Sequence, residues 1–287
     1  MPHRSLARAA VAAATALLTA ACSTAVGASD GQQSVAEAPG RLTQALPDDP
    51  VRMVLPTTGA ETRWTQGLNV FGQQLARAAA AECARAGGFR LTEEVPVAFI
   101  PFGDLPDLGF LGRHGFGRSA EVPTGPRASA SARAGGATET HRCRAVGATA
   151  AEQVAKRYQP LQKAWFGALD NAVKGDSAAR RALRDLPGCL AREGYAAADQ
   201  RAFFALVDRR LMSTPAADLA RVNTGLGGAY AHCMRPVEAV REPVRRKVRE
   251  RFLTDHAAEV RGLRTALFPA LHRAGERYGV PLVFPAP

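Results

Sequence analysis

The feature that most constrains the fold is a long apolar stripe near the C-terminus. From Val237 to Leu271 an apolar or aromatic residue recurs at every third or fourth position, with His256 inside the series and Tyr278 one heptad further on. This spacing places all of them on one face of an α-helix. Because so long a helix must bury its stripe against other helices, the sequence predicts a mainly α fold, in which this helix forms a hairpin with residues 148–170.

Helical spacing recurs in earlier parts of the chain. Trp64, Leu68, Phe71, Leu75, Ala79 and Cys83 share one face, and Gly87-Gly88 can end that helix. Similar patterns predict helices over 148–170, 176–186, 199–211 and from 214 through Cys233. Pro236 is expected to open the last long helix, Pro243 to bend it early, and Pro269 to kink or end it.

A short motif built on cysteine occurs twice. Cys83 and Cys189 each begin the pattern Cys-x4-Gly-aromatic, and each is followed by one further cysteine, Cys143 and Cys233. In both copies the helix is expected to end at the glycine, with the aromatic ring folded back over the last turn and the cysteine fixed for pairing. Of the three possible connectivities we favour Cys83–Cys143 and Cys189–Cys233. The first bridge would hold together the ends of a Gly-, Pro- and Ser-rich loop over 103–140, which is expected to be partly disordered or functional.

The N-terminus has the form of an export signal. Arg4 and Arg8 precede an uncharged run from Ala9 to Ala21, and small residues stand before Cys22. A run of this length forms a helix of about 20 Å, too short for a bilayer core of roughly 30 Å. The segment resembles a bacterial lipoprotein signal with its lipobox, although Thr19 stands where that family prefers leucine. The resemblance implies removal of residues 1–21 and attachment of diacylglycerol, with palmitate among its acyl chains, to Cys22. An ordinary secretory signal that releases a free protein is the alternative.

The domain organisation follows from composition. Residues 22–55 are expected to be a flexible tether, which from Ser23 to Pro50 would reach roughly 30 Å, and residues 56–287 a helical domain stapled by the two disulfides. The four cysteines other than Cys22 form an even set, as expected of an exported chain. We therefore expect the domain to stand at the outer face of the cell membrane.

Two further motifs extend the resemblance. The C-terminal half resembles a pattern of actinobacterial exported lipoproteins of uncharacterised function. The resemblance rests on Cys189-x4-Gly-Tyr and on Cys233, which leads into a charged helix with Phe252 and His256. Arg113-His114-Gly115-Phe116 is similar to a Gly-aromatic piece between their first two motifs. The likeness covers about residues 60–270 and implies no known activity.

No strong catalytic signature is present, and we predict no catalytic residue, metal or cofactor. His256 is interpreted as a hydrogen-bonded core residue, with a pH-sensitive group or a ligand as the alternative. His141 and His232 adjoin Cys143 and Cys233, but they could help to bind zinc only if the disulfides were absent.

A basic cluster occupies the long helix. It comprises Arg241, Arg245, Arg246, Lys247, Arg249 and Arg251. The cluster has two interpretations: a solvated helix face, or a surface that contacts anionic head groups or wall polymers. The formal charge of the chain, +11, favours an anionic partner, and export argues against nucleic acid.

Two functions stay open from the sequence. The first is a non-enzymatic, membrane-tethered lipoprotein that binds an envelope component or an unknown protein partner. The second is an extracytoplasmic hydrolase of wall material that uses Asp104, Asp107 or His114 in the loop region.

Overall fold

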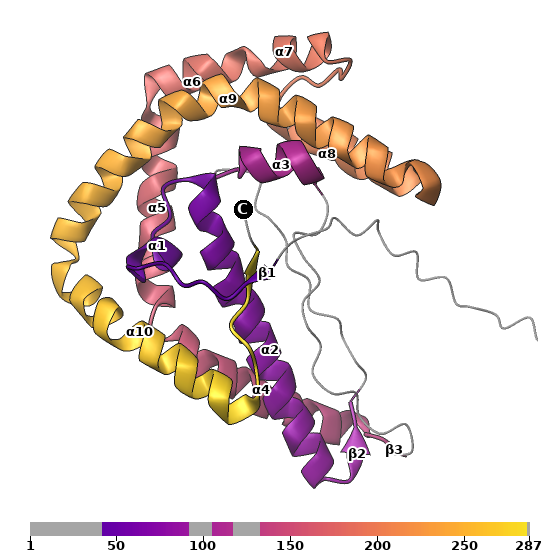
Figure 1. Cartoon of the computed structure of the whole chain (residues 1–287), viewed down its shortest axis with the longest axis vertical. Coiled ribbons are helices and arrows are strands. Elements are labelled where there is room, and N and C mark those ends of the chain that lie inside the picture. The colour runs from indigo at the N-terminus through magenta and orange to yellow at the C-terminus, as the bar shows by residue number, and fades with distance from the viewer. Residues whose placement is uncertain (1–41, 92–104, 117–132, 286–287) are drawn as a thin grey trace, which may run out of the picture. The chain divides into compact units, whose positions relative to one another are not determined.

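Helices make up most of the structure, a computed structural model that describes residues 42–91, 105–116 and 133–285 (Figure 1). All of these residues belong to one compact unit, Ser34–Pro287. The predicted mainly α fold is confirmed. In chain order the helices are α1 (Val51–Val54), the 3-10 turn η1 (Gly59–Glu61), α2 (Thr62–Ala86), α3 (Leu108–His114), α4 (Ala137–Ala155), α5 (Gln159–Gly175), α6 (Ser177–Arg184), α7 (Leu186–Arg192), α8 (Gln200–Ser213), α9 (Ala216–Asp255) and α10 (Ala257–Tyr278).

Four two-residue strands join distant parts of the described chain. They are β1 (Leu42–Thr43), β2 (Phe89–Arg90), β3 (Arg133–Ala134) and β4 (Phe284–Pro285). β1 pairs antiparallel with β4, and β2 pairs in parallel with β3. The first pair ties the chain just before α1 to its C-terminal end, and the second lies where α2 ends and α4 begins.

The long C-terminal helix is present, but its bounds differ from the prediction. α9 has 40 residues and begins at Ala216, so the helix expected from residue 214 and the one expected from Pro236 are a single element. Pro236 and Pro243 lie inside it, on its exposed side, where the carbonyl groups that lose a hydrogen bond can reach water. Figure 1 shows α9 curved, which is how a long helix accommodates such positions. The break falls instead at His256, between α9 and α10.

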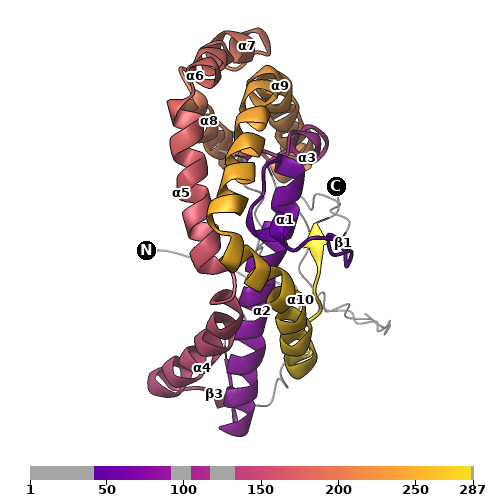
Figure 2. The same ribbon diagram turned by 90° about the vertical axis from the view of Figure 1, so that its left-hand side faces the viewer.

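One apolar core joins α1, α2, α5, α10 and the last turns of α9. Trp165 of α5 is fully buried and meets Phe252 of α9 edge-on, with ring centroids 5.4 Å apart. The predicted hairpin is correct for α5, which packs against α9, whereas α4 packs against α2 (Figure 2). Residues 148–170 therefore divide between two helices with different neighbours.

A second core lies under α3, α7, α8 and the first half of α9. Phe203 of α8 and Tyr230 of α9 stack there, with centroids 5.7 Å apart and ring planes 8° apart. Phe116, from the motif after α3, adds a third ring 5.5 Å from Tyr230. The aromatic residue of Arg113-His114-Gly115-Phe116 is thus part of this core.

Close packing of α3 on α9 depends on glycine. A Cβ atom on Gly227 would lie 2.3 Å from the carbonyl oxygen of Leu111 and 2.5 Å from Cα of Gly115. Gly115 itself has φ of 74°, which favours glycine. Buried Asn223 completes the contact, since its Oδ1 accepts from Phe116 N at 2.7 Å and its Nδ2 donates to the carbonyl of His114 at 3.2 Å. Gly227, which weakens the helical pattern in sequence, permits this approach.

Two predicted boundaries are wrong. The tether was expected to extend to residue 55, but Val51, Met53, Val54 and Leu55 are buried in the first core, so residues 42–55 belong to the folded body. The loop 103–140 contains α3, and α4 already begins at Ala137. α1 has four residues and α3 has seven, which is too few to show a helical period in the sequence. Tertiary contacts therefore decide the structure of both. The remaining residues of the tether and of the loop lie outside the described ranges.

Candidate functional site

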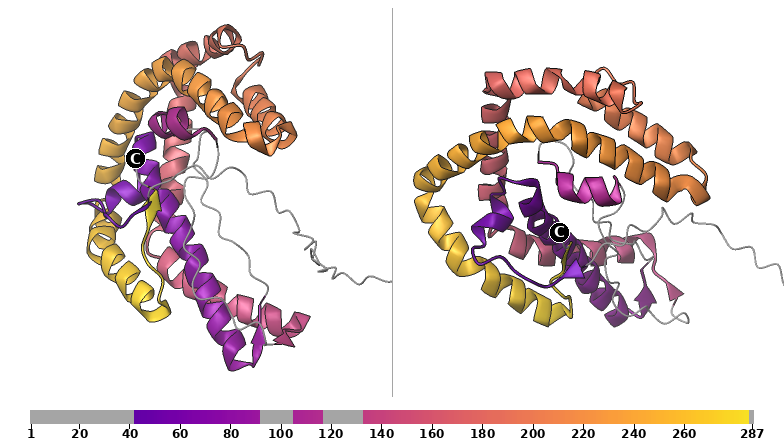
Figure 3. Two further views of the ribbon diagram at one scale, coloured as in Figure 1. Left: turned by 45° about the vertical axis from the view of Figure 1, so that its right-hand side comes forward. Right: turned by 45° about the horizontal axis from the view of Figure 1, so that its top comes forward.

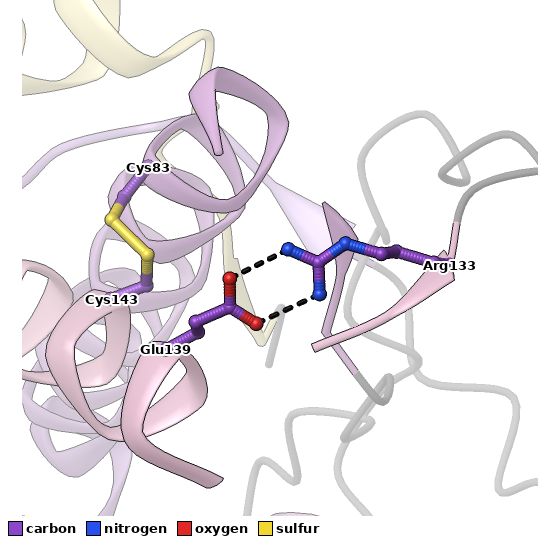
Figure 4. The surroundings of a disulfide bond; sticks show 4 residues. All are labelled: Cys83, Arg133, Glu139 and Cys143. Carbon is purple, nitrogen blue, oxygen red and sulfur yellow. Dashed lines mark hydrogen bonds and ion pairs between the residues drawn. A yellow bond between two sulfur atoms is a disulfide. The ribbon is translucent and has the colours of Figure 1, made fainter. Parts of the chain in front are cut away.

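Two disulfides are formed with the predicted connectivity. Cys83 of α2 bonds Cys143 of α4, with an S–S distance of 2.02 Å (Figure 4), and Cys189 of α7 bonds Cys233 of α9, at 1.94 Å. Both belong to apolar clusters, so each staple joins two helices inside a packed region. Cys22 lies outside the described residues.

The helices that carry Cys83 and Cys189 end at the predicted glycines. Gly88 and Gly194 have φ of 69° and 86°, in the left-handed region that ends helices. Tyr195 N donates to the carbonyl of Leu190 at 2.8 Å, and Gly194 N donates to Ala191 at 3.1 Å, which together form a Schellman motif. Phe89 is buried beside the first disulfide. The repeat is therefore a structural device that ends a helix and positions its cysteine.

An ion pair adjoins the first disulfide. Arg133 donates from both Nη atoms to Glu139, at 2.8 and 2.6 Å, and Gly136 N donates to the same carboxylate at 2.9 Å (Figure 4). The hydrogen bonds from Arg133, followed by that from Gly136, lower the pKa of Glu139 to about 2. The carboxylate thus stays ionised at the start of α4, where a negative charge complements the helix dipole.

A cluster of charged side chains lies between α9 and the chain before α2. We call it the arginine clamp: Arg241, Arg245 and Arg249 of α9, with Glu238 and Glu61. Two of these residues, Arg245 and Arg249, reach the backbone or the acid of the N-terminal segment. Arg249 Nη1 donates to Glu61 Oε2 at 3.0 Å and to the carbonyl of Leu55 at 3.3 Å, while Arg245 Nε donates to the carbonyl of Thr57 at 2.7 Å.

Glu238 holds the arginines from their own helix. Its carboxylate accepts from Arg245 Nη2 and lies 3.5 Å from Arg241 Nη1. Only 7% of Arg241 and 1% of Arg245 is exposed. The clamp therefore places buried cations beside a buried acid, an arrangement whose partners cannot be removed singly without leaving a buried charge.

The clamped segment is held from other helices as well. Trp165 of α5 donates from Nε1 to the carbonyl of Pro56 at 3.1 Å, so Leu55, Pro56 and Thr57 in succession have their carbonyls bound by side chains. Further upstream, Arg264 of α10 pairs with Asp49 at 2.8 Å. Buried backbone acceptors outside regular structure need such partners.

Glu61 forms the other end of the clamp. It accepts from Thr57 N at 2.8 Å, Thr57 Oγ1 at 3.1 Å and Arg52 Nε at 2.9 Å, besides Arg249. Burial by itself would raise the pKa of Glu61, but the hydrogen bonds from Thr57 and Arg52 and the charge of Arg249 outweigh it and lower the pKa. The carboxylate is ionised in the folded protein.

We expect Glu61 to make stability fall in acid. Because its folded pKa lies below the ordinary value of 4.5, its contribution is fully present above that value and is lost as the pH falls through the folded pKa. Replacing Glu61 with glutamine should lower the free energy of unfolding by about 2 kcal/mol at neutral pH. Urea unfolding between about pH 6 and pH 3 should show the two stability curves converging in acid.

The exposed Glu82 of α2 gives the matched control. Glu82→Gln should leave the stability curve parallel to that of the wild type across the same pH range. A Glu61→Gln curve that also stays parallel to the wild type would show that Glu61 is not the group responsible.

The basic cluster predicted on α9 does not form one surface. Arg241 and Arg245 are buried and Arg249 is partly buried, whereas Arg246, Lys247 and Arg251 are exposed. Of these exposed residues, Arg246 pairs with Glu242. The interpretations of all six as a solvated face, or as one anionic contact surface, are therefore wrong for the buried members. The spacing of 241, 245 and 249 places them on one helix face, which is the signal that separates them from the others.

The histidines do not converge on one site. His256 is partly exposed at the break between α9 and α10, stacks on Phe252 at 4.1 Å, and has Nδ1 3.4 Å from Oε1 of Glu259. The prediction of a buried core histidine is thus wrong, because the helix ends there. His141 and His232 are exposed beside disulfide-bonded cysteines. Among the described residues no group of three or more potential ligands could hold a metal ion.

The hydrolase candidates lie around α3. Asp107 caps this helix, with its Oδ1 accepting from Phe110 N at 2.9 Å. His114 packs on Phe110 at 4.6 Å, and its pKa is lowered by burial and by Arg113 against the opposing effect of Asp107. Asp104 lies outside the described ranges. The geometry gives Asp107 the role of a helix cap.

The chain matches no protein-family model, and the comparisons with curated proteins and with solved structures give no match either. In the described part of the chain, no helix combines the length and the apolar character that crossing a membrane requires.

Proposed function

We propose that the protein is a non-enzymatic lipoprotein, anchored through Cys22 at the outer face of the cell membrane, which acts by binding another component of the envelope. The arginine clamp carries this proposal. Within it Arg245 binds Glu238 and the backbone of Thr57, and Arg249 binds Glu61, so the chemistry of these side chains is used to hold the fold together.

The disulfides support the extracytoplasmic location. Bridges such as Cys83–Cys143 and Cys189–Cys233 form and persist in oxidising compartments outside the cytoplasm. With these four cysteines paired, Cys22 is the one cysteine of the sequence left for lipid attachment.

A binding role accounts better for α3 than hydrolysis does. Asp107 is engaged as a helix cap, and the backbone around His114 and Phe116 is fixed by Asn223. The side-chain carboxylate of Asp107 caps α3 itself, and the backbone carbonyl of His114 accepts from Asn223 of α9, so these contacts are structural ones.

Lipidation can be tested in an actinobacterial host that expresses the full chain. We expect an alkyne analogue of palmitate to label the wild type, the labelled peptide to begin at Cys22, and the protein to enter the detergent phase of Triton X-114. Cys22→Ser should abolish labelling. Thr19→Leu, which restores the residue preferred by lipoprotein signals, is the matched control and should preserve it. An unlabelled wild-type chain in the culture medium would overturn the anchor and support a secreted protein.

A further inference from the structure

The end of α8 and the turn into α9 carry an exposed basic and apolar surface. A hollow of about 420 Å³ is lined by Leu206, Arg209, Arg210 and Ser213. Met212, three residues after Arg209 on the same helix, is 80% exposed, more than the other exposed large apolar residues of the described ranges, Val146 and Phe166. Figure 3 shows α8 and the first half of α9 side by side, joined at this turn. We call the surface formed by Leu206, Arg209, Arg210, Met212 and Ser213 the α8 tip.

The turn itself is well defined. Thr214 Oγ1 donates to the carbonyl of Arg210 at 2.6 Å, and Pro215 precedes the first residue of α9. Leu206 and Leu211 pack partly against the second core, beneath the exposed positions. The α8 tip is thus held by a packed hairpin and presents its side chains on a fixed backbone.

The charges at the α8 tip are unbalanced. In the described part of the chain neither Arg209 nor Arg210 has an acidic partner within ion-pair distance, and both are exposed. Of the nearby acids, Asp218 is paired with Arg221 at 2.8 Å, which leaves Asp208 as the opposing charge. The surface therefore attracts anions, unlike Arg246 on α9, which is paired with Glu242.

We infer that the α8 tip contacts an anionic phospholipid surface, with Arg209 and Arg210 at the phosphate groups and Met212 inserted at the boundary of the acyl chains. Cations beside an exposed apolar side chain are typical of helices that lie at membrane interfaces. A wall polymer would satisfy the arginines but gives no environment for Met212, so we favour the lipid. The inference rests on the proposed membrane location and names a second contact with the membrane.

Vesicle binding tests this contact apart from the lipid anchor. The mature chain, secreted behind a general leader and carrying Cys22→Ser, is sedimented with vesicles of equal parts phosphatidylglycerol and phosphatidylcholine, or of phosphatidylcholine alone. We expect binding to the anionic vesicles only, and weaker binding in high salt. Arg209→Ala with Arg210→Ala should weaken it about 30-fold, and Met212→Gln about threefold to tenfold.

The adjacent arginines of α6 provide a matched control. Arg180 and Arg181 are also exposed neighbours on one helix, so Arg180→Ala with Arg181→Ala should leave binding within about twofold of the starting protein. Thermal unfolding of each variant checks that the fold is kept.

Three results would overturn the inference. They are absence of binding to anionic vesicles, an equal loss of binding in the α6 variant, and full competition by soluble polyglycerol phosphate without an effect of Met212→Gln, which would indicate a wall polymer. Because the assay contains no lipidated chain, failure of the Cys22 anchor in cells leaves its result unchanged.

Discussion

Replacing Cys83 and Cys143 together with alanine is expected to lower the free energy of unfolding by about 4 kcal/mol, the chain-entropy value for a loop of this length. The bridge closes 60 residues between α2 and α4. Its surroundings are small, since the buried cluster around it consists of Ala84, Phe89 and Cys143. We therefore expect the loss to open this region locally, with amide protection falling first at the end of α2 and the start of α4. Urea unfolding and hydrogen exchange measure both effects.

The second bridge is the matched control for this local effect. Cys189–Cys233 closes 44 residues, so the chain-entropy estimate is again about 4 kcal/mol. It lies, however, within the larger core that contains Phe203, Leu226 and Tyr230. Removing it should lower global stability without early exchange in α7 and α9. If both double variants lost amide protection early and to the same extent around the missing bridge, the size of the surrounding core would not determine whether opening is local.

Replacing Arg245 with methionine is the second change expected to have a large effect, about 3 to 5 kcal/mol of lost stability. The side chain is 1% exposed and joins Glu238 to the carbonyl of Thr57. Methionine would fill much of the space, but it would leave a buried carboxylate with a weaker ion pair to Arg241 and a backbone acceptor without a donor. Chemical denaturation of the purified chain measures the loss.

The neighbouring arginine supplies the control. Arg246 is exposed, and its pair with Glu242 lies within α9, so Arg246→Ala should cost less than about 1 kcal/mol. Adding Glu238→Gln to Arg245→Met should deepen the loss, because it leaves the buried Arg241 without its acid. A cost for Arg245→Met no larger than that of Arg246→Ala would contradict the role assigned to the clamp.

The sequence was most informative where side chains repeat at helical spacing. The stripe from Val237 to Leu271 predicted a single long helix, and the repeated cysteine motif predicted both disulfides and the glycines at which α2 and α7 end. The stripe and the helix ends are local, since each depends on residues a few positions apart, whereas the disulfides join cysteines 60 and 44 residues apart. The position of the break did not follow from them: it falls at His256, whereas Pro236 and Pro243 are accommodated inside a curved helix.

The arginine clamp could be predicted only in part. The spacing of Arg241, Arg245 and Arg249 puts three cations on one face of a helix, which by itself suggests repulsion. Glu238 compensates Arg241 and Arg245 from the same helix, but the other partners, Glu61 and Thr57, lie 188 residues away in sequence. A single sequence contains no signal that joins these segments, so the clamp and the burial of residues 51–55 emerged from tertiary contacts.

The location of the clamp determines how a mechanical load on the N-terminal side would enter the body. A pull on the chain before Leu42 would first strain the β1–β4 pair, then the Asp49–Arg264 pair, and then the bonds from α9 and α5 to Leu55, Pro56 and Thr57. Trp64 of α2, whose Nε1 donates to the carbonyl of Ala45 at 3.3 Å, would share this load with α5, α9 and α10. A chain held at one end to a membrane would thus divide its traction between polar contacts from α2, α5, α9 and α10.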